Sequence, residues 1–404
     1  MPPLAFPPAA GNLRPGLVLV GLAAFLAVRC QAAPSAPADA ASDFLYQGEY
    51  TGTTASAKTG LGVQVVALGG GNFTAAFLAG GLPGAGWDGS GRAEQSGKQG
   101  ASGVAFTGQA GGYAAAVSAD GASLTGTTPA GEAFTLAKVE RRSPTLGAPP
   151  PPDALVLFDG TGLSAFAPGT AVLDSGLLLP QGSAGSGAVT LRAFGSFTLH
   201  LEFLIPFMPN STGQARGNSG VYLQGRYELQ ILDSFGLNLL RGRPGEETQE
   251  CGAFYQSAGP LLNMSFPPLL WQTYDVDFKA ARFDSSGKTQ LDSARVTVRL
   301  NGAVIHQDRK LPNSTLLGDP IGPDDGPLRF QAHGDPVKYR NIWIVEQAGA
   351  AARPAPPRRR SGSARPQGPE AAAVAADGRS IRDPSSGVFF YRGGAAGPDI
   401  AVPR

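Results

Sequence analysis

Between residues 155 and 346 apolar and polar residues alternate with a period of two. In FTLHLEFLI, residues 197–205, apolar side chains fill one face, and Thr198, His200 and Glu202 fill the other. TYDVDFK, residues 273–279, repeats the pattern with two aspartates on its polar face. This period is typical of strands that bury one face, and no helical period of useful length interrupts it.

Turn signals divide these strands into hairpins. Asn301–Gly302 lies between two β runs in RVTVRLNGAVIH and is the preferred pair for a type I′ turn. Gly225–Arg226 separates VYLQ from YELQIL in the same way, and PLRFQAH and KYRNIWIVE supply further strands. Many antiparallel strands without helices predict an all-β, double-sheet jelly roll or sandwich over residues 153–347, rather than a small barrel.

The flanking regions differ in composition from this domain. Residues 42–142 alternate short β runs with glycine-rich turns at the spacing of a small all-β accessory domain. Residues 143–152 contain four consecutive prolines, which favour polyproline II and predict a semi-rigid linker. Residues 348–404 are rich in Pro, Ala and Arg and predict a disordered tail.

The N-terminus predicts export. Arg14 precedes an apolar run, residues 15–28, that is shorter than the ~20 residues of a membrane span. Small residues follow, as at a cleavage site. We therefore expect a signal peptide over residues 1–38, no transmembrane span in the mature chain, and a periplasmic or secreted protein. An uncleaved anchor is the alternative.

Composition narrows the classes of partner. Charged residues make up 16% of the chain and the net charge is +1, which argues against a nucleic-acid surface and favours a neutral small molecule or a glycan. If Cys30 leaves with the signal, Cys251 has no partner for a disulfide. The sequence has no G-x-S-x-G, H-E-x-x-H, Walker or Rossmann motif, and its three histidines make a His-rich metal site improbable.

Two segments concentrate polar side chains within strands. In RGNSGVYLQGRYELQILDSFG, residues 216–236, alternation puts Glu228 and Gln230 on one face. A carboxylate and an amide there are costly unless they are paired or face a cleft, although an exposed outer sheet face would also tolerate them. In RFQAHG, the same period aligns Arg329, Gln331 and His333. Histidine is suited to proton transfer near neutral pH, and a structural role is the alternative.

These motifs carry a resemblance to a known family. LFDGTGLSAF, RGNSGVYLQGRYELQILDSFG, CGAFYQ, PPLLWQTYDVDF, VTVRLNG and RFQAHGDPVKYRNIWI occur in the order expected of the 3-keto-disaccharide hydrolase domain. The resemblance spans residues 153–347 and implies a concanavalin A-like jelly roll with a carbohydrate cleft. Residues 42–142, with GLPGAGWDG, are similar to the β unit that precedes this domain in some bacterial members.

The resemblance also implies a site. It assigns catalysis to Glu228 and His333, and substrate binding to Asn218, Tyr222, Gln230, Asp233, Tyr255, Gln331 and Arg340. Two positions depart from the family pattern. Phe166 stands where a tryptophan is usual, and Ala332 stands where this subgroup often has an acid, so the QAHG segment itself supplies no acidic partner for His333.

The implied activity is hydrolysis of 3-keto glycosides or 3-keto-disaccharides, with elimination followed by hydration as the route. A ketone at C3 acidifies the hydrogen at C2, a base removes it, and the enolate expels the oxygen at C1 before water adds. This chemistry needs one tuned base, Glu228 or His333, and donors such as Gln230, Arg340 or Tyr255 for the enolate oxygen. The resemblance identifies no cofactor with certainty. A divalent metal could polarise the ketone, although the sequence shows no dedicated ligand set.

Two alternatives belong to other classes. Jelly rolls of this kind often only bind glycans, so a non-catalytic carbohydrate-binding or cell-envelope module is the main rival. A conventional glucanase with two carboxylates is disfavoured, because alternation puts Glu228 and Asp233 on opposite faces of their strand.

Overall fold

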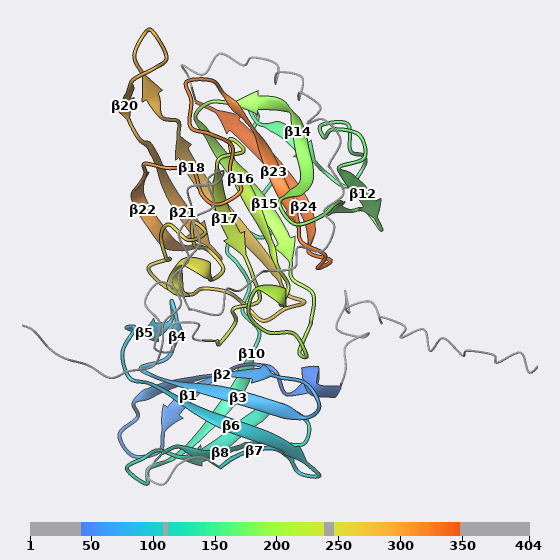
Figure 1. The fold of residues 1–404 in the computed structure, drawn as a ribbon. Coiled ribbons are helices and arrows are strands. Elements are labelled where there is room, and N and C mark those ends of the chain that lie inside the picture. The colour runs from blue at the N-terminus through green and yellow to red at the C-terminus, as the bar shows by residue number, and fades with distance from the viewer. Residues whose placement is uncertain (1–41, 108–111, 238–245, 348–404) are drawn as a thin grey trace, which may run out of the picture. The chain divides into compact units, whose positions relative to one another are not determined.

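A computed structural model describes residues 42–107, 112–237 and 246–347 of the chain (Figure 1). The predicted signal peptide, residues 1–38, and the predicted tail, residues 348–404, lie outside the described residues. Within them, every regular element is a β-strand or a short 3-10 helix: η2 (Ser42–Leu45), η3 (Gly213–Ala215) and η4 (Glu246–Gln249). The all-β prediction is confirmed. Among these residues, no helix has the length and apolar character to cross a membrane.

The first domain is a closed eight-stranded barrel with strand order β1-β10-β9-β8-β7-β6-β3-β2. Its strands are β1 (Gly48–Thr54), β2 (Gly60–Ala67), β3 (Asn72–Ala79), β6 (Arg92–Gly100), β7 (Gly103–Thr107), β8 (Ala114–Val117), β9 (Ser123–Thr127) and β10 (Ala133–Val139), and β4 (Leu82–Pro83) pairs with β5 (Gly86–Trp87) beside them. Alternate residues such as Val63, Phe77 and Phe106 fill its interior. The barrel therefore contains a packed core.

The second domain is a β sandwich of two main sheets. The larger sheet has the order β12-β13-β24-β15-β18-β21-β22, with β11 paired to β24, and the smaller has the order β14-β23-β16-β17. The larger sheet comprises β11 (Leu155–Phe158), β12 (Ala171–Asp174), β13 (Leu177–Pro180), β15 (Phe197–Leu204), β18 (Trp271–Lys279), β21 (Ala294–Leu300), β22 (Ala303–Leu311) and β24 (Lys338–Glu346). The smaller comprises β14 (Ser186–Phe194), β16 (Ser219–Leu223), β17 (Tyr227–Ile231) and β23 (Gly326–Ala332), while β19 (Arg282–Phe283) and β20 (Gln290–Asp292) form a separate pair.

One hydrophobic core joins the two sheets of the sandwich. Leu199, Leu201 and Phe203 of β15 lie in the same buried cluster as Val221 of β16 and Phe330 of β23. The polar residues between them, such as those of β15, face away from that cluster. The period of two in the sequence therefore corresponds to the inward and outward faces of these strands.

The predicted hairpin turn is present between β21 and β22. Asn301 and Gly302 both have positive φ, 52° and 83°, and the flanking residues Leu300 and Ala303 pair with each other. These values are those of a type I′ turn, in which both central residues need positive φ.

A β-bulge interrupts the regular alternation of β24. The register with β15 shifts between the pairs His200–Trp343 and Glu202–Arg340, and Asn341 has a φ of 44°. As a result two residues, Arg340 and Asn341, separate the core residues Tyr339 and Ile342, where regular alternation would leave one. Arg340 therefore lies on the outward face of the sheet. A bulge re-aims a side chain in this manner because it inserts one extra residue into one strand.

The proline-rich segment that joins the domains is hydrogen-bonded to the larger sheet. The hydroxyls of Ser143 and Thr273 lie 2.6 Å apart, and the backbone N–H of Gly147 donates to Glu202 Oε1 at 2.6 Å. Asn341 Nδ2 donates to the carbonyl of Ala148 at 3.0 Å. The start of the predicted spacer is therefore attached along the sandwich instead of running free of it.

The turn at Gly302 generates a prediction for stability. We expect Gly302→Ala to lower the free energy of unfolding by ~1–3 kcal/mol, because the residue has positive φ and a Cβ there would lie 2.4 Å from Pro144 Cγ. Urea unfolding measures the change. Gly162→Ala is the matched control, since a Cβ at Gly162 meets nothing within 4 Å, and equal losses for both variants would contradict the prediction.

Candidate functional site

Polar side chains gather on the outward face of the smaller sheet, the face opposite its core. Strand pairing sets Tyr222 of β16 beside Arg329 of β23 on one side and beside Glu228 of β17 on the other. Gln230 and Gln331 lie two residues further along their strands, so they share this face. We call these five residues the polar face. Their neighbours in sequence, including Leu229 and Phe330, point into the core.

Glu228 is the buried acid of the polar face, with 3% of its surface exposed. The hydroxyl of Tyr222 donates to Glu228 Oε2 at 2.8 Å. Gly220 leaves room for the carboxylate, because a Cβ at that position would lie 2.6 Å from Glu228 Oε1. Burial raises the pKa of Glu228 to about 7, against the opposing effects of the Tyr222 hydrogen bond, the Arg329 charge and the Gln331 side chain. Glu228 is therefore poised to exchange a proton near neutral pH.

Amide side chains extend the polar face beyond Glu228. Gln230 Nε2 donates to Gln214 Oε1 at 2.8 Å, and Asn218 Nδ2 donates to the backbone carbonyl of Gln214 at 2.7 Å. The amide oxygens of Asn218, Gln230 and Gln331 are buried and have no hydrogen-bond partner within the described ranges. Buried acceptors are normally satisfied, so these three oxygens are suited to receive donors such as sugar hydroxyls from a ligand.

His333 lies just beyond the end of β23 and is half-buried. The nearby carboxylate of Asp335 accepts the backbone N–H of Asn218 at 2.6 Å. Burial raises the pKa of Asp335, while that hydrogen bond and the charge of His333 act in the opposite direction. Asp335 is thus the acidic neighbour of His333, a role that Ala332 has no side-chain group to fill. The sequence feature that could have indicated this neighbour is the tripeptide HGD, residues 333–335.

Tyr255 and Asp233 have different surroundings. The backbone N–H of Tyr255 donates to the carbonyl of Glu228 at 3.1 Å, which places this half-buried tyrosine next to the polar face. Asp233 follows the end of β17, is buried, and accepts a hydrogen bond from Arg216 Nε at 2.7 Å. The Asp233 carboxylate is therefore engaged in an internal ion pair.

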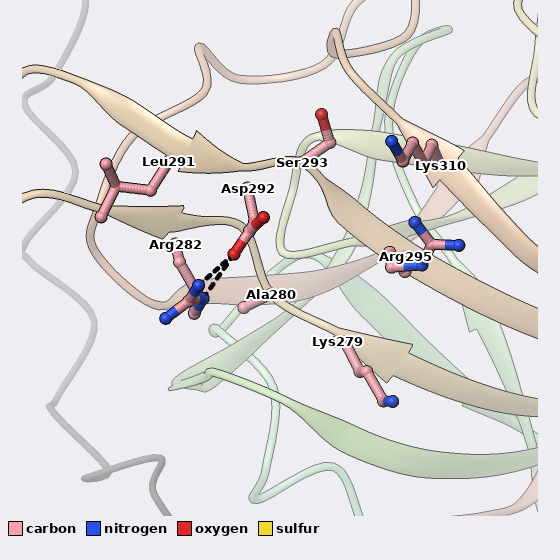
Figure 2. A pocket seen from close by; sticks show the side chains of 8 residues that line it. All are labelled: Lys279, Ala280, Arg282, Leu291, Asp292, Ser293, Arg295 and Lys310. Atoms are coloured by element: carbon pink, nitrogen blue, oxygen red, sulfur yellow. Dashed lines mark hydrogen bonds and ion pairs between the residues drawn. The ribbon is translucent and has the colours of Figure 1, made fainter.

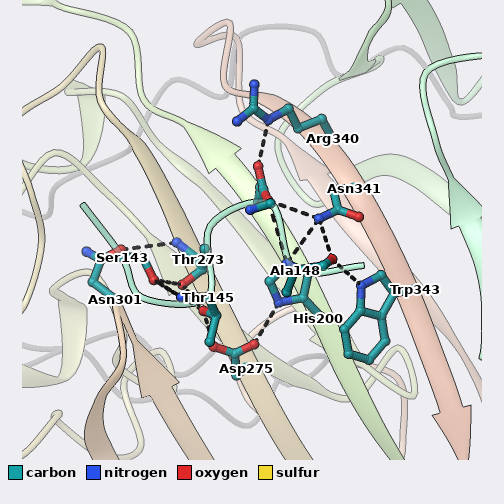
Figure 3. Close-up of polar contacts among 12 residues, drawn as sticks. Ser143, Thr145, Ala148, His200, Thr273, Asp275, Asn301, Arg340, Asn341 and Trp343 are labelled. Carbon is teal, nitrogen blue, oxygen red and sulfur yellow. Dashed lines mark hydrogen bonds and ion pairs between the residues drawn. The ribbon is translucent and has the colours of Figure 1, made fainter. Parts of the chain in front are cut away.

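Arg340 is not part of the polar face, because its strand, β24, belongs to the larger sheet. Its side chain lies on the outward side of that sheet (Figure 3). Its Nε donates to Glu202 Oε2 at 2.6 Å, and its guanidinium lies 3.9 Å from the centre of the Trp271 ring. The hydrophobic core lies between this position and Glu228. The structure therefore brings together Tyr222, Glu228, Gln230 and Gln331 as expected, but not Arg340.

Arg340 belongs instead to a polar group around His200. His200 Nδ1 lies 2.6 Å from Asp275 Oδ1, and Asn341 Nδ2 donates to Glu202 Oε1 at 3.0 Å (Figure 3). Burial raises the pKa of Glu202, but hydrogen bonds from His200, Asn341, Arg340 and Gly147 outweigh it and lower the pKa to about 2. Because these side chains also bind the segment that joins the two domains, we interpret the group as structural.

A surface pocket of about 380 Å³ lies elsewhere on the sandwich, beside β18 to β22 (Figure 2). Its lining includes Lys279, Arg295 and Lys310, together with an ion pair between Arg282 and Asp292. It has no buried acid or base suited to proton transfer, so the polar face is the better candidate. In the part of the chain that the structure describes, no three His, Cys, Asp or Glu side chains gather as a metal site would require.

Comparisons with known proteins address the same domain. Residues 153–345 match the family model described as a 3-keto-alpha-glucoside-1,2-lyase-like domain. A solved candidate glycosyl hydrolase from Parabacteroides distasonis ATCC 8503 is 32% identical, and the match covers 49% of this chain and 85% of that chain with a TM-score of 0.43. Another from that organism is 19% identical over 48% of this chain and 94% of that chain, with a TM-score of 0.36. A search of curated proteins finds no match.

The His200 group generates a pH-dependent prediction. Burial lowers the pKa of His200, but Asp275 and Glu202 outweigh it, so the folded-state pKa lies above the ordinary value of 6.5. The stability that His200 contributes is then fully present below pH 6.5 and is lost as pH rises through the folded-state pKa. We expect His200→Gln to reduce the free energy of unfolding more at about pH 5.5 than at about pH 8.5. Urea unfolding at the two pH values measures this difference.

His306 is the matched control for this experiment. It is also buried, but burial lowers its pKa to about 4. Its contribution is therefore present above pH 6.5 and is lost as pH falls toward 4, so His306→Gln should show the opposite pH trend. The same trend for both variants would contradict the role assigned to Asp275 and Glu202.

Proposed function

Because the chain belongs to the 3-keto-alpha-glucoside-1,2-lyase-like family, we propose that it cleaves 3-keto glycosides by elimination followed by addition of water. The family acts on glycosides, and its name describes an elimination across C1 and C2 of a 3-keto-glucoside, in which the C1–O and C2–H bonds break. The substrate of this chain would be a small 3-keto glycoside or 3-keto-disaccharide. The signal peptide predicted from the sequence would put the reaction in the periplasm or outside the cell.

The observation that carries the proposal is the buried carboxylate of Glu228, whose pKa is about 7. A ketone at C3 makes the hydrogen at C2 acidic, and a base that is half ionised near neutral pH removes it efficiently. The pair of electrons left at C2 then forms a double bond to C1 as the C1–O bond breaks. Water subsequently adds across that double bond, so no oxidant or reductant is consumed.

The surroundings of Glu228 favour this route over a two-carboxylate mechanism. Ordinary glycosidases use a pair of carboxyl groups about 5–9.5 Å apart, one on each side of the scissile bond. Here the carboxylate of Asp233 is bound by Arg216, and that of Asp335 holds the backbone N–H of Asn218. Of these three carboxylates, Glu228 is the one bound by a neutral side-chain hydroxyl, which suits it to act as the single base that the elimination requires.

Other residues would take supporting roles. The buried amide oxygens of Asn218, Gln230 and Gln331 would accept hydrogen bonds from hydroxyls of the sugar. His333, which lies half-buried near Asp335, would protonate the departing oxygen. Such assignments give each polar group of the site a partner that a neutral sugar can supply.

Keto selectivity is the direct test. We expect the protein to cleave a 3-keto glucoside and to ignore the same glucoside after reduction of its ketone, because the C2 hydrogen then loses its acidity. Glu228→Gln should lower kcat ~10²–10⁴-fold and stop exchange of the C2 hydrogen with deuterated water, and His333→Ala should also slow turnover. Chromatography of products and NMR of the C2 position provide the two measurements.

The control for loss of a carboxylate is Asp277→Asn, which alters an exposed acid on the outward face of the larger sheet. It should leave kcat unchanged. Binding of 3-keto glucosides without turnover would favour a carbohydrate-binding module. Equal cleavage of the keto and reduced substrates would instead point to an oxocarbenium mechanism.

The raised pKa of Glu228 predicts a pH dependence of both rate and stability. The kcat/KM should fall below pH 7 as the carboxylate is protonated. Because the folded-state pKa exceeds the ordinary 4.5, ionisation destabilises the folded protein increasingly between pH 4.5 and 7. We expect Glu228→Gln to raise the free energy of unfolding by ~1–3 kcal/mol above pH 7 and to have little effect near pH 4. No pH dependence of this difference would refute the assignment.

A further inference from the structure

Arg329 lies at one end of the row of polar residues that crosses the polar face. It lies on β23 between two neighbours, with Val189 of β14 on one side and Tyr222 of β16 on the other. Tyr222 in turn pairs with Glu228 of β17. The register therefore orders the three polar residues across the sheet as cation, tyrosine and carboxylate.

The guanidinium of Arg329 is buried with one donor unused. Only 5% of the residue is exposed, and Nη2 donates to the carbonyl of Leu317 at 2.7 Å. Nε is buried and has no hydrogen-bond partner among the described residues. A buried charged donor without an acceptor is costly, so this atom calls for an acceptor that the protein does not supply.

Tyr222 keeps Arg329 and Glu228 apart while contacting both. The guanidinium of Arg329 lies 3.9 Å from the centre of the Tyr222 ring, and the hydroxyl of the same ring donates to Glu228 Oε2. A direct ion pair would occupy the arginine donors and depress the pKa of the carboxylate. With the ring between them, a base and a cationic donor lie on one face of the sheet without neutralising each other.

We propose that Arg329 is a catalytic residue whose Nε–H binds the ketone oxygen at C3 and stabilises the negative charge that develops there. This assignment rests on the proposed function. In the step concerned, the C2–H bond breaks and its proton moves to Glu228. The electron pair forms the C2–C3 double bond, and the carbonyl π electrons move to the oxygen held by Arg329. When the carbonyl re-forms, the C1–C2 double bond forms and the C1–O bond breaks.

The structure explains why this donor suits the enolate better than the ground-state ketone. The guanidinium is held by the Leu317 carbonyl and the Tyr222 ring, so it does not need to reorganise as charge develops. A fixed charged donor strengthens its hydrogen bond as the acceptor becomes anionic, which accelerates the chemical step more than it tightens binding.

The test is turnover and C2 exchange in Arg329→Gln, with a 3-keto glucoside as the probe. We expect kcat to fall ~10²–10³-fold with little change in KM, and exchange of the C2 hydrogen in deuterated water to fall in parallel. The acidic limb of the kcat/KM profile should also move to higher pH, because the Arg329 charge opposes the burial that raises the pKa of Glu228. An arginine that only supports the fold would not produce this set of changes.

Two further variants keep the test decisive. Arg329→Lys retains the charge without Nε and should retain part of the exchange, which also covers the case in which the glutamine variant unfolds. Arg299→Gln removes an exposed arginine of β21 and should behave like the parent. Turnover and exchange within about threefold of the parent in Arg329→Gln, or a loss confined to KM, would overturn the proposal. Failure of the parent itself to cleave the 3-keto glucoside would reject the proposed function, and this assignment with it.

Discussion

The apolar core between the two sheets of the sandwich is the constraint on which the candidate site depends. It takes every second side chain of β16, β17 and β23, so the residues in between must lie together on the opposite face. A slip of one residue in the register would bury the carboxylate of Glu228 in the core and expose Leu229 and Phe330. The burial of apolar side chains that stabilises the sandwich therefore also fixes the strand register that puts Arg329, Tyr222 and Glu228 in one row.

Alternation let much of this arrangement be predicted from the sequence. The period of two placed Glu228 and Gln230 on one face, and the Asn301–Gly302 pair gave the correct hairpin turn because only a few residue types adopt positive φ at low cost. Sequence reasoning could not supply the closure of the first domain into a barrel, since closure depends on which distant strands pair. It also missed Asp335 as the acid near His333, because the HGD tripeptide lies beyond the end of the strand, where the period of two no longer assigns neighbours.

Arg340 shows where placement by resemblance fails, because its strand, β24, belongs to the larger sheet and not to the sheet that carries Glu228. A single β-bulge shifts the register of β24 against β15, and residues on the two sides of it no longer follow one alternation. Arg340 consequently pairs with Glu202 on the outward face of the larger sheet, where the same group of side chains binds the proline-rich segment. Proline content alone indicated a spacer, because composition does not reveal which backbone groups meet hydrogen-bond partners in the fold.

Tyr222 separates the guanidinium of Arg329 from the carboxylate of Glu228 and so prevents a direct ion pair between them. Arg329 and Glu228 have opposite charges and lie on strands that flank the same neighbour, so a smaller residue at position 222 would let them approach and neutralise each other. The aromatic ring fills that space, and its hydroxyl satisfies one carboxylate oxygen without supplying positive charge. Burial can then dominate the pKa of Glu228, while Nε of Arg329 stays without an acceptor from the described protein. In the proposed reaction, a base and a cation that would neutralise each other in direct contact thus act on two different atoms of one substrate.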